Sequence, residues 1–144
     1  MAEVMHLIKI HASPERVYQA LATAQGIRGW WTRDAALDPK IGGAGEFGFY
    51  ERRFVIKVKI DELKPPKHIA WTAISSGGGV FDGTTIAFDL RPDGSDTGLS
   101  LAHRGFKEAD NNYASATTRW GFYLFSLKRF LENGKGCCFQ NYLA

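Results

Sequence analysis

Two polar side chains in the second half of the chain could handle protons. In the hairpin expected from two late strands, Thr84 opposes His103, and Asp82 lies one step further along. A histidine near a hydroxyl and a carboxylate at the mouth of a cavity can orient a ligand, or act as an acid or base. A surface histidine at the end of a strand explains the same pattern without catalysis, and we favour that interpretation. His103 and Asp82 are therefore candidate catalytic residues in a protein that the sequence describes better as a binder than as an enzyme.

A larger group of apolar and aromatic side chains could surround a small molecule. Aromatic stripes usually form a core, but beneath a helix that lies over a curved sheet they can wall a ligand cavity. Trp71 joins the group only if the hairpin after the turn at 64–67 keeps one register. Arg52 and Arg119 lie close to these positions and could pair with a ligand carboxylate, or lie in solvent. The candidate ligand-binding residues are Trp30, Trp31, Phe47, Phe49, Ile56, Trp71, Ile86, His103, Tyr113, Trp120 and Leu124.

Other kinds of site find little support in the sequence. Cys137 and Cys138 are adjacent near the C-terminus, and the four histidines have no spacing typical of a metal site. The glycine-rich segments 42–45 and 77–79 lead into strands and lack a following Lys-Ser or Lys-Thr pair, so neither resembles a phosphate-binding loop. The chain also lacks a Gly-x-Ser-x-Gly elbow for a nucleophilic serine. We expect no metal and no cofactor.

The composition is that of one ordinary globular domain. The chain has 144 residues, of which 44% are hydrophobic, 13% aromatic and 23% charged, which suits a single core. Its net charge of +3 comes from interspersed signs and gives no reason to expect nucleic acid. No apolar run approaches the roughly 18 residues that cross a bilayer, and the start of the chain lacks a signal-peptide pattern. We expect a cytoplasmic protein without membrane insertion.

The elements that must position these residues begin with a strand over 3–11, where apolar and polar residues alternate. Ser13 and Pro14 then suit the start of a helix, because serine caps the helix end and proline has no amide hydrogen to lose there. Gly26 and Gly29 are expected to break this helix, and a second short helical piece follows near Trp30.

From Asp34 to about residue 111, alternating segments and turn signals predict an antiparallel meander. Its last hairpin is expected to place Ile86 opposite Leu101. After Asp110, apolar residues three and four positions apart predict one long amphipathic helix, which ends at Asn133. A curved antiparallel sheet wrapped around a long C-terminal helix, with two short helices after the first strand, is an α+β helix-grip fold.

Five segments, in their order along the chain, resemble those of a known family. They are Gly29-Trp30-Trp31-Thr32, Ile41-Gly42-Gly43, Lys64-Pro65-Pro66-Lys67, His103-Arg104-Gly105-Phe106 and the stretch 120–136. The chain resembles the SRPBCC (START/Bet v-like) superfamily, and within it the branch of the C-terminal domain of Aha-type heat-shock ATPase activators. The resemblance implies a single helix-grip domain over 1–136, followed by a tail at 137–144. It implies function less closely, because members bind lipids, polyketides and hormones, catalyse cyclisation or assist a chaperone.

The leading hypothesis is a domain that encloses a small apolar or aromatic ligand in a hydrophobic cavity between the sheet and the last helix. One alternative is an enzyme like the polyketide cyclases and dehydratases, with His103 and Asp82 moving protons. Another is an Aha-type co-chaperone-like protein, whose contact surface would be the back of the last helix at Phe122 and an outer basic row. A homodimer contact also stays open. The basic row comprises Arg53, Lys57, Lys59, Lys64 and Lys67.

Overall fold

The computed structural model describes residues 2–138, which form a seven-stranded antiparallel sheet, three α-helices and one short 3-10 helix. The strand order across the sheet is β1-β7-β6-β5-β4-β3-β2. In chain order the elements are β1 (Ala2–Ile10), α1 (Pro14–Ala22), α2 (Ala24–Trp30), β2 (Asp34–Leu37), β3 (Ala44–Phe49), β4 (Phe54–Lys64), β5 (His68–Ser75), η1 (Gly77–Gly79), β6 (Thr85–Asp93), β7 (Asp96–Phe106) and α3 (Asn111–Asn133).

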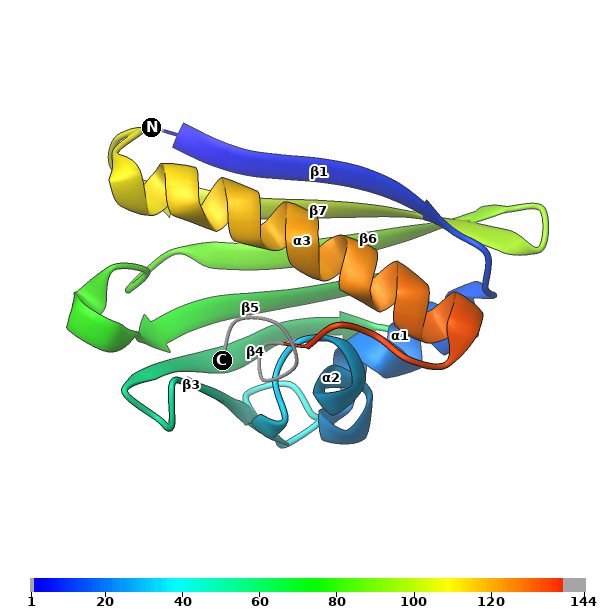
Figure 1. Cartoon of the computed structure of the whole chain (residues 1–144), viewed down its shortest axis with the longest axis horizontal. Helices are drawn as coiled ribbons and strands as arrows, with labels where there is room; N and C mark the ends of the chain where they lie inside the picture. Colours follow the sequence, from blue (N-terminus) through cyan, green and yellow to red (C-terminus); the bar gives the residue numbers. More distant parts are fainter. Residues whose placement is uncertain (1, 139–144) are drawn as a thin grey trace.

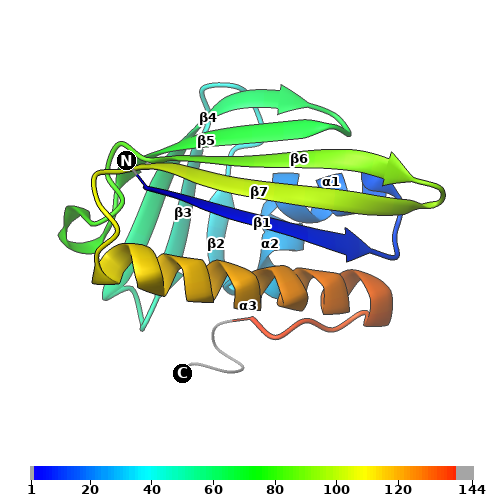
Figure 2. The ribbon, with the colours of Figure 1, turned by 90° about the horizontal axis from the view of Figure 1, so that it is seen from above.

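The sheet curves, and α3 lies across its open side (Figure 1, Figure 2). The helices α1 and α2 close one end of this space, where α1 contacts β6 and β7 and both helices contact α3. This arrangement confirms the predicted α+β helix-grip fold. Among the described helices, none combines the length and the apolar composition that crossing a bilayer requires.

The break between the two short helices lies at a different residue from the one expected. Thr23 alone separates α1 from α2, with an extended backbone and a side-chain oxygen that accepts the amide hydrogen of Gly26 at 3.0 Å. Gly26 and Gly29 lie inside α2, so the prediction that they break the helix is wrong. Glycine is needed there for close packing, because a Cβ would lie 2.5 Å from Ala20 Cα in one case and 2.4 Å from the Phe130 ring in the other.

The short edge strand β2 was not expected from the sequence. Its four residues are too few to show alternation. It forms because Ala35 pairs with Phe47 of β3, so β2 depends on a neighbouring strand that lies ten residues further along the chain.

The hairpin of β6 and β7 has a register two residues away from the expected one. Ile86 lies opposite His103, and not opposite Leu101 as predicted. The two-residue loop consists of Gly94 and Ser95, with Gly94 at a φ of 63°, a left-handed conformation that glycine adopts without strain. Because side chains alternate with a period of two, this correction leaves the same side chains facing inward.

Side chains from the helices form hydrogen bonds with backbone carbonyl groups at both edges of the sheet. On β1, the carbonyl oxygen of Glu3 accepts the Tyr113 hydroxyl at 2.8 Å, and that of Lys9 accepts Lys128 Nζ at 2.7 Å. On β2, Ala35 O accepts two hydrogen bonds from the guanidinium of Arg28 on α2, at 2.7 and 3.1 Å. Helix α3 therefore covers the β1 edge, and α2 covers the β2 edge.

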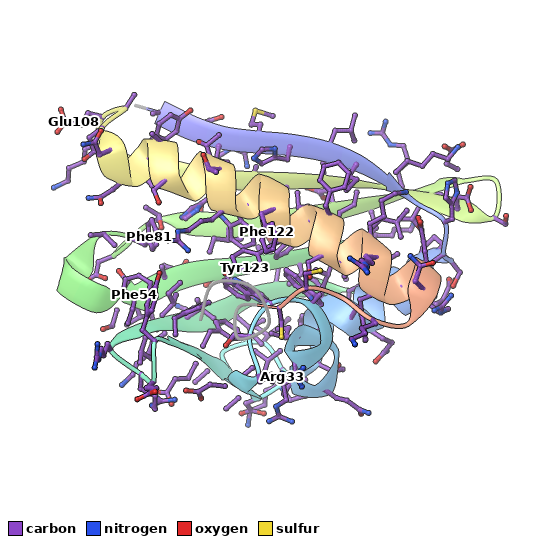
Figure 3. All side chains as sticks on the ribbon, in the orientation of Figure 1. Arg33, Phe54, Phe81, Glu108, Phe122 and Tyr123 are labelled. Carbon is purple, nitrogen blue, oxygen red and sulfur yellow. The ribbon has the colours of Figure 1, made fainter. Side chains whose placement is uncertain are left out.

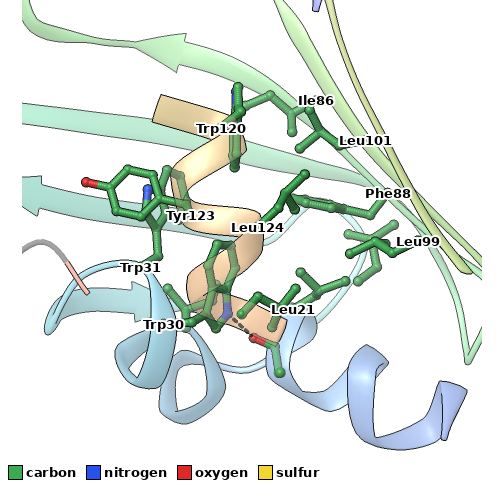
Figure 4. Close-up of a cluster of buried hydrophobic side chains, with 14 of the residues drawn as sticks. Leu21, Trp30, Trp31, Ile86, Phe88, Leu99, Leu101, Trp120, Tyr123 and Leu124 are labelled. Atoms are coloured by element: carbon green, nitrogen blue, oxygen red, sulfur yellow. Dashed lines mark hydrogen bonds between the residues drawn. The ribbon is translucent and has the colours of Figure 1, made fainter. Parts of the chain in front are cut away.

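Four tryptophans form a continuous cluster at the centre of the core, and Figure 4 labels Trp30, Trp31 and Trp120. Trp30 of α2 is fully buried, its indole N–H donates to Ala20 O at 2.8 Å, and its ring stacks on Trp31 with centroids 5.7 Å apart. The Trp31 ring in turn lies 6.3 Å from that of Trp71 on β5 and 5.3 Å from that of Trp120 on α3. This cluster joins the short helices, the sheet and the long helix.

The chain beyond α3 packs back against the domain. Cys137 N–H donates to Ser126 Oγ at 2.8 Å, and the Ser126 hydroxyl donates to Trp30 O at 2.7 Å. The Cys138 side chain is 1% exposed. The first two residues of the expected tail at 137–144 are thus docked on α2 and α3, while 139–144 lie outside the described residues.

Candidate functional site

A cavity of about 260 Å³ remains between the sheet and the first half of α3. Its walls are mostly aromatic and aliphatic, and the labelled side chains of Phe54, Phe81 and Tyr123 lie around it in Figure 3. The complete set of lining residues is Trp31, Phe49, Tyr50, Phe54, Ile56, Val80, Phe81, Ile86, His103, Asn112, Ser115, Ala116, Arg119, Trp120 and Tyr123.

Six of the residues expected to bind a ligand border this cavity. They come from the end of α2, from β3, β4, β6 and β7, and from α3, so the fold brings together positions far apart in the sequence. Each points inward because of the alternation in its strand or its position on the helix stripe. These residues are Trp31, Phe49, Ile56, Ile86, His103 and Trp120.

Five other residues expected to bind a ligand are not among those that border the cavity. Four of them are at most 1% exposed and fill the core, namely Trp30, Phe47, Trp71 and Leu124. Trp71 does point inward, but the rings of Phe47 and Trp31 cover it at 5.5 and 6.3 Å. Tyr113 faces β1, where its hydroxyl bonds to a backbone carbonyl and its ring lies 5.4 Å from that of Phe106.

Eight lining residues were missed, whereas Arg119 was expected only as a possible partner of a ligand carboxylate. Some of the eight lie in turns, where no periodicity marks an inward side chain; Tyr50 and Phe81 are examples. Others lie on α3, where Ala116 and Tyr123 are four and three residues from Trp120 and so share its face of the helix. The missed residues are Tyr50, Phe54, Val80, Phe81, Asn112, Ser115, Ala116 and Tyr123.

Both ring nitrogens of His103 make hydrogen bonds in the wall of the cavity. The Trp120 indole N–H can only donate, and it lies 3.0 Å from His103 Nδ1, which therefore accepts. The proton of the neutral ring is then on Nε2, which donates to Thr84 Oγ1 at 2.8 Å, and the Thr84 hydroxyl donates to Phe81 O at 2.6 Å. Burial lowers the pKa of His103 to about 4, so the ring is neutral at pH 7.

The expected proton-handling pair is not formed. Asp82 accepts a hydrogen bond from the Ser76 hydroxyl at 2.9 Å and does not border the cavity. Since His103 has no unused nitrogen, it could take up or release a proton only by breaking one of its buried hydrogen bonds. The geometry thus assigns His103 a structural role, in which it positions the Trp120 ring.

A polar group lies on the α3 side of the cavity. Arg119 Nη2 lies 3.4 Å from the Tyr50 hydroxyl, and Arg119 Nε lies 3.3 Å from Ser115 Oγ. The hydroxyl of Tyr123 is buried near Arg119 and makes no hydrogen bond of good geometry with any described residue. Burial raises the pKa of Tyr123 to about 12, although the nearby positive charge of Arg119 acts in the opposite direction.

The turn between β3 and β4 holds Tyr50 at the rim of the cavity. Tyr50, Glu51 and Arg52 have φ angles of 51°, 55° and 68°, a left-handed run that costs energy for residues other than glycine. Arg52 fastens the turn by ion pairs with Asp34 at 2.7 Å and Glu46 at 3.0 Å. Arg52 therefore pairs with carboxylates of the protein itself, and it does not border the cavity.

The arrangement of these elements matches a known family. The model of the activator of Hsp90 ATPase homolog 1-like proteins matches residues 11–132, a span that includes every residue lining the cavity. The chain belongs to this family. None of the curated proteins compared matches it.

Solved structures support the same assignment of this Aha-type domain. The solution structure of the Aha1 dimer from Colwellia psychrerythraea is 34% identical in sequence, with a TM-score of 0.85 over 94% of this chain and 100% of that one. MLL2253 from Mesorhizobium loti is 21% identical, with a TM-score of 0.81 over 91% and 97% of the two chains. CalU16 from Micromonospora echinospora is 18% identical, with a TM-score of 0.72 over 92% and 77%. The last two show the fold alone, and the predicted SRPBCC resemblance is confirmed.

The Gly-Trp-Trp segment of this Aha-type domain has distinct roles at successive residues. Gly29 leaves room for the Phe130 ring, Trp30 fills the core, and Trp31 lines the cavity. A change in how α2 packs on α3 would therefore move a wall of the cavity.

Proposed function

We propose that this Aha-type domain binds a small apolar or aromatic molecule in the cavity beneath α3. The observation that carries the proposal is the cavity itself, about 260 Å³ of space with mainly apolar walls in an otherwise closely packed core. Ligand sites in proteins are typically clefts of about 300–1,000 Å³ lined by apolar side chains with a few polar groups. At about 260 Å³ the cavity lies just below that range and suits a compact ligand of one or two rings.

Catalysis by the expected residues has less support. A cyclase-like enzyme needs a group that exchanges protons with its substrate. His103 borders the cavity, but both of its nitrogens are bonded, and Asp82 bonds to Ser76. Binding a ligand without a chemical reaction does not require His103 or Asp82 to change its hydrogen-bond partners.

Titration with apolar probes tests the proposed function. Flavonoids, fatty acids and naphthalene derivatives should change the tryptophan fluorescence, because Trp31 and Trp120 border the cavity. They should also raise the melting temperature, since a ligand that binds only the folded state stabilises it by mass action. We expect micromolar dissociation constants for the compounds that fit.

Two leucine substitutions on α3 provide the matched control. Ala116 is buried and lines the cavity, whereas Ala114 is exposed on the same helix. Ala116→Leu should fill part of the space and abolish the fluorescence change, while Ala114→Leu should leave it unaltered. Binding that survives Ala116→Leu, or no response to any probe up to its solubility limit, would contradict a ligand site in this cavity.

Contact with a chaperone is a second candidate, which the family description favours. The expected contact surface is only partly available. In the outer basic row, Lys57, Lys59 and Lys64 each lie 3.3–3.7 Å from a carboxylate, so neighbouring charges offset one another. Phe122 is half-buried, while Phe125 of the same helix is 65% exposed. A pull-down with the middle domain of an Hsp90-type chaperone tests this candidate, and Phe125→Ser should weaken capture.

We also propose that two copies of the domain associate through the outer face of β1. Met5 and Leu7 are 66% and 79% exposed there, and the Colwellia psychrerythraea relative is described as a dimer. Leu7→Glu should shift sedimentation from dimer to monomer, because it places a charge in an apolar contact. Ile74→Glu, at a position 56% exposed on β5, is the control. A wild-type chain that sediments as a monomer at every concentration would disprove this association.

A further inference from the structure

A buried hydroxyl in the cavity wall has no well-formed hydrogen bond. Tyr123 is only 3% exposed, and its hydroxyl lies near Arg119 without meeting good hydrogen-bond geometry with any residue among 2–138. Buried polar groups are nearly always bonded, since burying one without a partner is unfavourable. A hydroxyl with unused bonding capacity in a cavity wall therefore indicates where a polar group of a ligand would lie.

A positive charge lies next to this hydroxyl. Arg119 and Tyr123 are four residues apart on α3, so they share one face of the helix, and the charge of Arg119 acts on the ionisation of Tyr123. The guanidinium makes two long contacts, to Tyr50 and Ser115, at 3.4 and 3.3 Å. Within the part of the chain that the structure describes, no carboxylate lies within 4.0 Å of Arg119.

The rest of the cavity wall offers nothing to neutralise that charge. The lining residues include no aspartate and no glutamate. In contrast, Arg52 at the neighbouring turn has two carboxylate partners, and Arg104 on β7 has one. Arg119 is thus a cation at the rim of an apolar cavity with no acidic side chain of the described chain to pair with.

We infer that the ligand of this cavity is an apolar or aromatic acid, whose carboxylate is held by Arg119 and the Tyr123 hydroxyl. The inference rests on the proposed binding function and names the class of ligand. A guanidinium and a phenolic O–H are both donors, and together they suit a carboxylate, which only accepts. Tyr123 keeps its proton near neutral pH, because burial raises its pKa to about 12. The apolar body of the acid would then lie against Trp31, Ile86 and Trp120.

Matched pairs of acids and amides test the inference. We would measure the binding of benzoate, 2-naphthoate and decanoate by calorimetry at pH 7.5, each beside its uncharged amide. At least one acid should bind roughly tenfold or more tightly than its amide, since hydrogen bonds to charged groups are the stronger ones. Raising the salt concentration should reduce this preference, because Arg119 is exposed to solvent on one side.

Three variants assign the preference to particular side chains. Arg119→Gln should remove it while leaving amide binding in place, and Tyr123→Phe should reduce acid binding without removing the apolar ring. Arg129→Gln, on the same helix but outside the cavity, should leave the preference unchanged. Circular dichroism of each variant would establish that the fold is retained.

The outcomes separate the two proposals. If neither acids nor amides bind, the proposed function fails. If an acid and its amide bind equally well, the cavity is a ligand site but the inferred carboxylate contact is wrong. A preference for the acid that persists in Arg119→Gln would likewise overturn the role of Arg119.

Discussion

Trp120→Ala is expected to lower the free energy of unfolding by about 3–5 kcal/mol, the usual cost of deleting a buried aromatic side chain. Trp120 is 6% exposed, and its ring lies 5.3 Å from that of Trp31 and 6.0 Å from that of Phe88. Alanine would also leave His103 Nδ1 without its donor. Since small domains are stable by only about 5–15 kcal/mol, this loss is a large fraction of the total.

Urea unfolding followed by circular dichroism would measure the effect, because tryptophan fluorescence itself changes in the variant. Phe125→Ala on the same helix is the matched control. The Phe125 side chain is 65% exposed, so its removal should cost less than about 1 kcal/mol. A similarly small loss for Trp120→Ala would show that Trp120 lies in an open space and not in the core.

Acid should destabilise the domain in a pH range set by His103. Burial lowers the pKa of this histidine from 6.5 to about 4, so the unfolded chain binds the proton more readily than the folded chain. The free energy of unfolding should therefore be independent of this group above pH 6.5. It should then fall as the pH drops from 6.5 to about 4, by roughly 3 kcal/mol in total.

In the upper part of that pH range, the effect of His103 on stability can be measured separately from the effect of the carboxylates. Hydrogen bonds from Lys64 and His68 lower the pKa of Glu62 below 4.5. Burial acts to raise the pKa of Glu132, but hydrogen bonds from the His11 backbone amide and from Lys128 outweigh it and lower that pKa below 4.5, so the stability that both groups contribute is lost only at lower pH. We would measure urea unfolding between pH 7.5 and 5 for the wild type and for His103→Asn, whose amide cannot titrate. The slope should be shallower in the variant. Equal slopes, or a His103 imidazole resonance that titrates near pH 6.5, would contradict this prediction.

Local chemistry explains which elements the sequence could predict. The ends of α3 follow from single residues, since Asp110 accepts the Tyr113 amide hydrogen at 3.0 Å and Gly134 adopts the left-handed conformation at a φ of 82°. The β6–β7 loop shows the limit of such reasoning. Gly94 predicts a turn, but whether it is the first or second loop residue depends on how the two whole strands pair.

The site was predicted less completely than the fold, because a cavity is the space that side chains leave unfilled once the helices and strands have packed together. Trp30 and Trp31 are adjacent in sequence and equally aromatic, yet one fills the core and the other borders the cavity. Their difference depends on where α2 lies on α3, which no local pattern records. Tyr50 and Phe81 reach the cavity from turns, so periodicity did not reveal them.

The side chains that occupy the sheet edges affect how the domain would aggregate. An incoming strand must find free carbonyl and amide groups along an edge, but at β1 the carbonyls of Glu3 and Lys9 already bond to α3, and at β2 that of Ala35 bonds to α2. Strand addition at these positions thus requires a helix to detach first. Detaching α3 removes Trp120 from the tryptophan cluster, and detaching α2 removes Trp30, so ordered aggregation at either edge is coupled to disruption of the core.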